Sequence, residues 1–166
     1  AYTRYDAQVR DTAVDWLQAR AAAGTDHPWC LYVGFVAPHF PLVCPEPFFS
    51  RYRDRDLPEP KLLPRDGYVQ HPWIEKQNAF MDSEAAFKAA DERLAAMSAY
   101  YGLCTWLDHN VGEILGALND TGLMETTTIV YTSDHGDNVG ARGLWGKSSM
   151  YEESAAVPLI LTGPDV

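Results

Sequence analysis

The sequence predicts an α/β domain built on an open, mainly parallel sheet with flanking helices. Two segments carry apolar residues at helical spacing, and they alternate with three short apolar or β-branched runs, at 29–37, at 126–133 and from Val157 onward. Helices that alternate with buried strands are typical of a sheet whose parallel strands are joined by helical crossovers.

The first half of the chain predicts a helix, a strand and a long irregular segment. Residues 5–23 place four apolar side chains at helical spacing between Arg and Asp residues, and Gly24 ends this helix: Val9, Ala13, Trp16 and Leu17. The run WCLYVGFVA at 29–37 has no alternation, which favours a strand covered on both faces. Four prolines between Pro38 and Pro47 argue against regular structure, and proline and charge continue to about Gln70, so we expect a long surface excursion there.

The second half predicts a long helix and two strands. Residues 83–118 are rich in Ala, Leu, Met and Glu, and apolar positions in three- and four-residue steps predict that the later part packs on the sheet. Asp108, His109 and Asn110 on this helix are expected to form a solvated face. After a turn near Gly122, strands are expected at 126–133 and from Val157, and the acids of MYEES are expected to open a short helix between them.

Composition restricts the possible partners and the setting. At 166 residues and 46% hydrophobic content the chain can form one globular domain or a large piece of one, and its formal charge of −10 argues against nucleic acid. No run reaches the roughly 18 apolar residues that a membrane span needs. Three cysteines without metal-type spacing, and a start without a signal-peptide core, favour a reduced, cytoplasmic setting. No pattern indicates an oligomeric state.

Chemically active side chains follow two of the predicted strands. His39 comes just after the strand at 29–37, and Asp134 and His135 come directly after the strand at 126–133. Ligands of open α/β sheets bind beyond the carboxyl ends of strands, so we expect these side chains to meet at one edge. Lys147 follows the glycine-bearing run ARGLWGK, which can fold back over that edge.

These residues together predict half of a site for ester hydrolysis at sulfur or phosphorus. Asp134 and His135 offer an oxygen and a nitrogen ligand, a pair that suits Ca, Mn, Zn or Fe, although two ligands alone do not hold a metal. His39 and Lys147 offer donors and positive charge for a tetrahedral oxyanion and for a leaving oxygen. Taken singly, each has a structural alternative: His39 as a loop residue, Asp134 as a backbone cap and Lys147 as a solvated charge.

Three ordered segments resemble the sulfatase family of the alkaline-phosphatase superfamily. YTSDHGDNVGARGLWGKSSMYEESAAVPLILTGP is similar to the family pattern T-S-D-[HN]-G, G-[KR] and Y-E-[EG]-x-x-x-V-P, FVAPHFPLVCPEPFFSRY resembles the histidine loop, and YYGLCTWLDHNVGEILGALNDTGL resembles the helix between them. The resemblance implies an alkaline-phosphatase-like sheet, a divalent metal (Ca first, Mn or Zn as alternatives) bound by Asp134 and His135, and a small-molecule sulfate ester contacted by His39 and Lys147.

The chain departs from that family at the nucleophile. Sulfatases carry C-x-P-S-R or a related motif whose cysteine matures to formylglycine, and none of Cys30, Cys44 and Cys104 stands in such a context. The resemblance therefore implies that residues 1–166 are the middle-to-late part of one catalytic domain, without the N-terminal nucleophile segment and inactive in isolation. Two alternatives stay open: a phosphonate monoester or phosphodiester hydrolase of the same superfamily, and a non-catalytic module that binds an anion or a metal.

Overall fold

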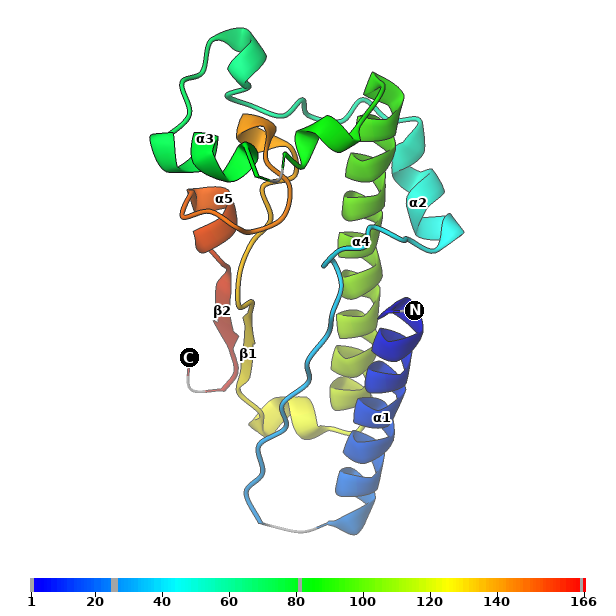
Figure 1. Cartoon of the computed structure of the whole chain (residues 1–166). Coiled ribbons are helices and arrows are strands. Elements are labelled where there is room, and N and C mark those ends of the chain that lie inside the picture. Colours follow the sequence, from blue (N-terminus) through cyan, green and yellow to red (C-terminus); the bar gives the residue numbers. More distant parts are fainter. Residues whose placement is uncertain (1, 25–26, 81, 165) are drawn as a thin grey trace.

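A single long helix forms the spine of the molecule. The computed structural model describes residues 2–24, 27–80, 82–164 and 166. Helix α4 (Ala90–Asp120) runs along much of the molecule, and α1 (Tyr2–Ala23) and α2 (Glu46–Arg53) pack against it (Figure 1). Across from α4 lie the remaining elements: α3 (Pro72–Asn78), α5 (Glu152–Ala155), β1 (Ile129–Thr132) and β2 (Leu159–Thr162). Single 3₁₀ turns lie at Pro64–Asp66, Glu84–Ala86, Leu123–Thr126 and Ala141–Gly143.

The two long helices predicted from apolar spacing are confirmed, with shifted starts. Helix α1 begins at Tyr2, and its end is followed by Gly24 with a left-handed φ of 57°. Helix α4 begins only at Ala90, because the Asp82 carboxylate accepts the N–H groups of Glu84 and Ala85 and organises a separate turn there.

The two strands pair antiparallel, so the expectation that they run parallel is wrong for this pair. Ile129 lies opposite Thr162 and Thr132 opposite Leu159. The segment 29–37, predicted as a buried strand, is extended (Figure 1) but forms no ladder with a neighbouring strand among the described residues, and Tyr32 within it is 92% exposed. A strand is defined by a ladder to a neighbour, and its own sequence specifies neither the neighbour nor its direction.

The core lies between the two long helices, the extended segment and β1. Leu17 of α1 and Leu118 of α4 are buried at its centre, and Trp29, Leu31 and Ile129 pack around them. Because the extended segment contributes the alternate side chains Trp29 and Leu31 to this core, packing on α1 and α4 fixes the first part of its path, before the turn that carries His39.

Helix α2 corrects the expectation of an irregular chain through Gln70. Pro45 stands at the N-cap and Pro47 lies in the first turn, where the missing N–H has no intrahelical partner to lose. The Phe48 ring then packs edge-on against Trp106 of α4 at 5.3 Å between centroids. The prolines at 45 and 47 therefore start this helix.

Asn110 corrects the expectation of a solvated polar face on α4. Asp108 and His109 are exposed, but Asn110 is fully buried. Its side chain accepts a hydrogen bond from Arg10 of α1 at 3.2 Å and donates to the Trp106 carbonyl at 2.6 Å. It therefore ties the two long helices together through a satisfied polar contact.

No helix among the described residues is long and apolar enough to cross a membrane.

The three cysteines are free thiols, and burial is the main cause that raises the pKa of both Cys44 and Cys104 to about 11. At neutral pH these two thiols are therefore protonated and weakly nucleophilic.

The contact between α2 and α4 depends on a glycine, which yields a first prediction. A Cβ at Gly102 would stand 2.6 Å from Cys44 Sγ and 2.9 Å from the Phe48 carbonyl oxygen. Gly102→Ala is expected to lower the free energy of unfolding by roughly 1–3 kcal/mol through overpacking. Urea unfolding measures this, with Gly112→Ala as the matched control, because a Cβ at Gly112 meets nothing within 4 Å. The control should gain up to about 1 kcal/mol from helix propensity. Equal effects of the two substitutions would contradict the packing argument.

Candidate active site

His39 sits on a tight turn at the end of the extended segment. The turn is closed by the hydrogen bond from the His39 N–H to the Val36 carbonyl at 3.0 Å. His39 Nδ1 lies 2.7 Å from the Phe40 carbonyl oxygen, so Nδ1 carries the proton and donates it there. The lone pair of a neutral ring is therefore on Nε2, which faces the rest of the site.

Lys147 reaches this ring from the glycine-bearing loop. Its Nζ lies 2.6 Å from His39 Nε2, the geometry of an ammonium that donates to the free ring nitrogen. The preceding Gly146 is held by Asn138, whose backbone N–H and side-chain amide both donate to the Gly146 carbonyl, at 2.9 and 2.6 Å. The Ser154 hydroxyl donates to the Lys147 carbonyl. The loop around Lys147 is thus held by side chains on both flanks.

Asp134 and His135 follow β1 after one intervening residue, and His135 lies beside His39. The ring centroids of His39 and His135 are 5.7 Å apart, and Asp134 Oδ2 lies 3.7 Å from His135 Nε2. Desolvation by itself raises the pKa of Asp134, but hydrogen bonds from the backbone N–H groups at 134 and 135 and the positive charge of Lys147 bring it below its ordinary value. Asp134 is therefore a carboxylate at neutral pH.

The donor pair fits a divalent cation as part of a shell. His135 Nδ1 lies 2.8 Å from the Gly136 carbonyl oxygen and donates to it, which leaves Nε2 unprotonated on the side of Asp134. A backbone carbonyl on the far nitrogen is the usual way in which a metal-binding imidazole is oriented. No group of three His, Cys, Asp or Glu side chains able to hold a metal occurs among the described residues.

Helix α5 connects the Asp134–His135 pair with the loop that carries Lys147. The carbonyl of Ser154 accepts the Gly136 N–H at 2.8 Å, while the hydroxyl of the same residue holds Lys147. A Cβ at Gly136 would stand 2.1 Å from the Glu153 carbonyl oxygen, so only glycine allows this approach. Sequence reasoning missed Ser154, because a buried serine in a short helix carries no pattern of its own.

Glu153 anchors this helix, a role beyond the helix start that its sequence position predicts. The helix does begin at Glu152, but the Glu153 carboxylate lies between the Arg142 guanidinium and Lys61 Nζ, the latter at 3.0 Å. Desolvation opposes ionisation, yet backbone hydrogen bonding and these two cations lower the pKa of Glu153 to about 2.

Arg142 joins the proline-rich excursion to the site loops. It adopts a left-handed φ of 58°, and its guanidinium stacks 4.2 Å from the Tyr151 ring centroid. Its N–H donates to the Lys61 carbonyl at 2.9 Å, and its own carbonyl accepts the Gln70 side chain at 2.7 Å. The excursion that sequence reasoning treated as surface is therefore bound to the loop that carries Lys147. A further contact of the same loop is the hydrogen bond that the Trp145 indole N–H donates to the Glu84 carboxylate at 2.8 Å.

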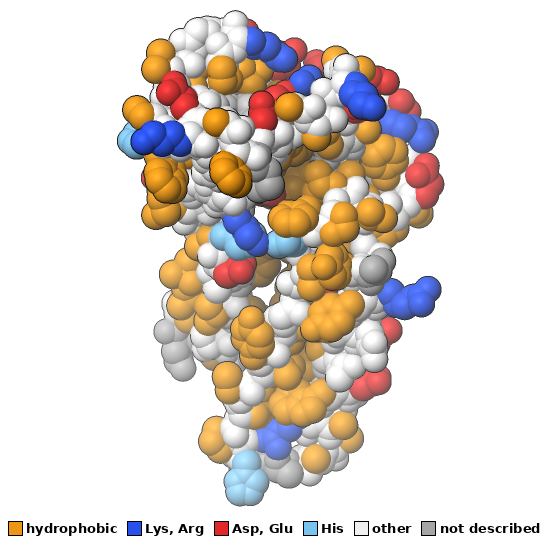
Figure 2. Space-filling model, in the orientation of Figure 1, with side chains coloured by type: hydrophobic (Ala, Val, Ile, Leu, Met, Phe, Trp, Pro, Cys, Tyr) orange, Lys and Arg blue, Asp and Glu red, His pale blue; other side chains and the backbone are white. Residues whose placement is uncertain are grey.

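The structure thus brings together all four side chains proposed from the sequence. Figure 2 shows basic and histidine side chains gathered beside a hollow midway along one face, with acidic side chains close by. The arrangement places a donor pair, His39 and Lys147, next to an oxygen–nitrogen ligand pair, Asp134 and His135. Such a site can bind a tetrahedral anion next to a bound cation.

Comparison with known proteins identifies the class. The sulfatase family model matches residues 1–166, and the chain therefore belongs to the sulfatase family. Among curated relatives, a choline-sulfatase of Rhizobium meliloti is 37% identical over 84% of this chain and 27% of its own length. An arylsulfatase of Clostridium perfringens is 33% identical over 94% of this chain and 31% of its own length.

Solved structures agree on the fold. A phosphonate monoester hydrolase from Silicibacter pomeroyi matches with a TM-score of 0.76 at 30% identity, over 92% of this chain and 32% of its own. A second such hydrolase, from Agrobacterium radiobacter, matches at 0.76 and 25% identity over 93% of this chain and 32% of its own. These neighbours confirm an alkaline-phosphatase-like α/β fold. The chain spans less than a third of the length of these relatives.

The role of Glu153 yields a prediction for pH dependence. Because its pKa lies below the ordinary 4.5 in the folded state, the stabilisation is present above pH 4.5 and is lost as the pH falls toward about 2. Glu153→Gln should lower the free energy of unfolding at pH 7 by about 1–3 kcal/mol and flatten its decline below pH 4.5. Thermal unfolding across this range measures it, with exposed Glu152→Gln as the matched control. If the free energy of unfolding falls as steeply below pH 4.5 in Glu153→Gln as in the wild type, this carboxylate is not the cause of the fall.

Proposed function

We propose that the full-length protein hydrolyses sulfate monoesters and that residues 1–166 form part of its single catalytic domain. The observation that carries this proposal is the convergence of Lys147 and His39 at 2.6 Å, beside the Asp134–His135 pair. Membership of the sulfatase family, with choline-sulfatase and arylsulfatase relatives, supports the sulfate ester as substrate class.

In this proposal His39 and Lys147 bind and orient the transferred group. Lys147 places an ammonium where negative charge builds on the sulfuryl oxygens. Entry of the anion breaks the Lys147–His39 contact, and each side chain then meets a different oxygen. His39, held at Nδ1 by the Phe40 carbonyl, presents Nε2 toward the leaving oxygen, and as an imidazolium, protonated on both nitrogens, it would donate the Nε2 proton to that oxygen.

Asp134 and His135 would hold a divalent metal, with Ca as first choice and Mn or Zn as alternatives. The carboxylate is ionised and the imidazole Nε2 is free of its proton, as metal ligands must be. When bound, the metal supplies a Lewis acid that orients the ester and polarises its oxygens. The remaining ligands and a formylglycine nucleophile are proposed to come from sequence outside these 166 residues, because no C-x-P-S-R type motif occurs within them.

A phosphonate monoester hydrolase is the second candidate. It is favoured by the similarity to two solved phosphonate monoester hydrolases and to the multifunctional alkaline phosphatase superfamily protein PehA of Trinickia caryophylli, which is 32% identical over 81% of this chain and 28% of its own length. Rates of the full-length protein on an aryl sulfate and on an aryl phosphonate monoester decide between the two. We expect the sulfate to be the faster substrate, and a faster phosphonate would assign the second activity. Turnover of neither would favour a non-catalytic module, and the isolated 166 residues serve as the inactive control.

The role of Lys147 predicts a large kinetic effect. Lys147→Ala in the full-length protein should lower kcat for the aryl sulfate by about 10²–10³-fold, because one donor to the developing oxyanion is lost. Steady-state kinetics measure it, with exposed Lys88→Ala as a control that keeps wild-type rates. A rise in KM with unchanged kcat would show that Lys147 binds the substrate and the transition state equally well and does not act selectively on the developing charge.

The proposed metal predicts a separate result. Chelation should abolish turnover, and Ca²⁺ should restore it, with Mn²⁺ and Zn²⁺ tested alongside. Asp134→Asn should raise the metal concentration needed for half-restoration by at least about tenfold, because a charged ligand becomes a neutral amide. Calorimetric titration of metal into chelated protein gives the same comparison without turnover, and Asp137→Asn tests a neighbouring carboxylate not placed in the shell. Unchanged metal affinity in Asp134→Asn would remove this residue from the site.

A further inference from the structure

We propose that Asp6, a carboxylate on α1 remote in sequence from the site residues, is a positioning residue for His39. The inference rests on the proposed function of His39 and adds the device that holds it. Asp6 is fully buried, and its two oxygens accept the backbone N–H groups of Val36 and Ala37 at 2.8 and 3.0 Å. Those two N–H groups belong to the turn that carries His39.

The hydrogen bonds of this turn form a continuous series. Asp6 accepts the N–H of Ala37, and the Val36 carbonyl of the same peptide group accepts the N–H of His39 at 3.0 Å. The next contact is the ring itself, fixed at Nδ1 by Phe40 and at Nε2 by Lys147. From the Asp6 carboxylate on α1 to the Lys147 ammonium, every polar group of the series has a defined hydrogen-bond partner. A shift of the turn relative to α1 moves the imidazole by a similar amount.

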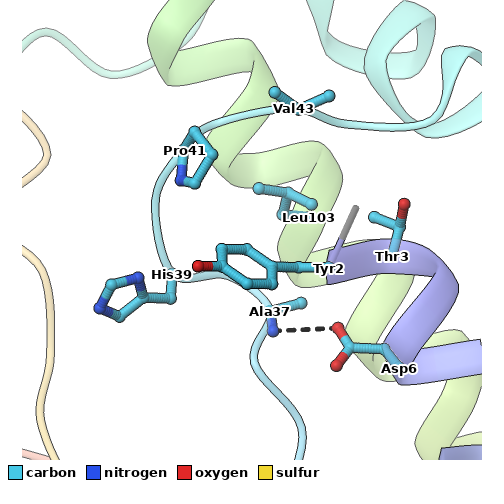
Figure 3. A pocket seen from close by; sticks show the side chains of 8 residues that line it. All are labelled: Tyr2, Thr3, Asp6, Ala37, His39, Pro41, Val43 and Leu103. Carbon is cyan, nitrogen blue, oxygen red and sulfur yellow. Dashed lines mark hydrogen bonds between the residues drawn. The ribbon is translucent and has the colours of Figure 1, made fainter.

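Packing alone does not fix the turn, because a cavity of about 90 Å³ lies beside it. Figure 3 shows the Asp6 carboxylate on α1 directed at the Ala37 N–H, with the Tyr2 ring between the helix and His39 and with Leu103 behind. In a close-packed loop, steric contact would restrict movement of the backbone. Here there is room beside His39, so the two hydrogen bonds from Asp6 carry the restraint.

The charge state and length of the side chain suit this task. A carboxylate offers only acceptors, so it can receive two adjacent N–H groups without turning a donor toward either of them. An amide at the same place would direct its NH₂ at one of these donors and leave a buried N–H without a partner. Asp6→Asn is therefore a nearly isosteric change that releases one of the two bonds.

The experiment is a double-mutant cycle in the full-length protein, which uses Asp6→Asn, His39→Ala and both together. We expect Asp6→Asn to lower kcat by about 10–100-fold with little change in KM, and more for aryl sulfates with poor leaving groups, because a displaced His39 no longer serves the leaving oxygen. In the His39→Ala background Asp6→Asn should change kcat by less than about twofold, since the two residues act as one unit. Exposed Asp15→Asn, on the same helix, is the matched control.

A second readout does not depend on turnover. Modification of His39 by diethyl pyrocarbonate, followed by mass spectrometry of the full-length protein, should be several times faster in Asp6→Asn than in the wild type or in Asp15→Asn. Asp6→Glu, which keeps both acceptors but lengthens the side chain, should fall between the two and serves where Asp6→Asn does not fold.

The outcomes separate this inference from the proposed function. If the wild type turns over neither ester, the proposed function fails, and the labelling rates still decide whether Asp6 holds His39. If the wild type is active, an equal loss from Asp6→Asn in both backgrounds, with unchanged labelling of His39, would reduce Asp6 to a general structural residue and overturn the inference.

Discussion

The two loops that carry the site have no ladder of regular structure, so their backbone polar groups must find partners on neighbouring elements. Buried side chains meet this constraint: Asp6 receives the turn before His39, Asn138 holds Gly146, and Ser154 holds both Lys147 and Gly136. The placement of the reactive groups follows from these contacts. Reactive side chains are held rigidly only when the residues that support them are themselves fixed by hydrogen bonds of this kind.

Electrostatics add a second level of organisation. A chain with a formal charge of −10 repels anions in general, so an anion site needs positive charge placed at one point. Lys147 beside His39 provides that point, while Arg142 is committed to Glu153 and stacks on Tyr151. The charges of Arg142 and Lys147 are thus kept apart, because each side chain has its own partner.

The arginine contact also joins two segments that lie far apart in the sequence. Arg142 binds the proline-rich excursion through Lys61 and Gln70 and, through Glu153, the helix that supports Lys147. Sulfatase and phosphonate monoester hydrolase relatives share this part of the fold. The proposed anion site therefore lies on a scaffold that sulfatase and phosphonate monoester hydrolase relatives have in common.

Local pattern was sufficient for the long helices α1 and α4 and for the residue types of the site, because apolar spacing and reactive side chains are written in the chain itself. It also indicated where the chain becomes extended. It did not give α2, because prolines that stop a helix in its interior also start one. Nor did it give the direction of β1 against β2, the burial of Asn110, or the parts played by Asp6, Ser154 and Glu153. Each of these depends on side-chain or backbone contacts that no local pattern specifies, so only the tertiary structure could decide them.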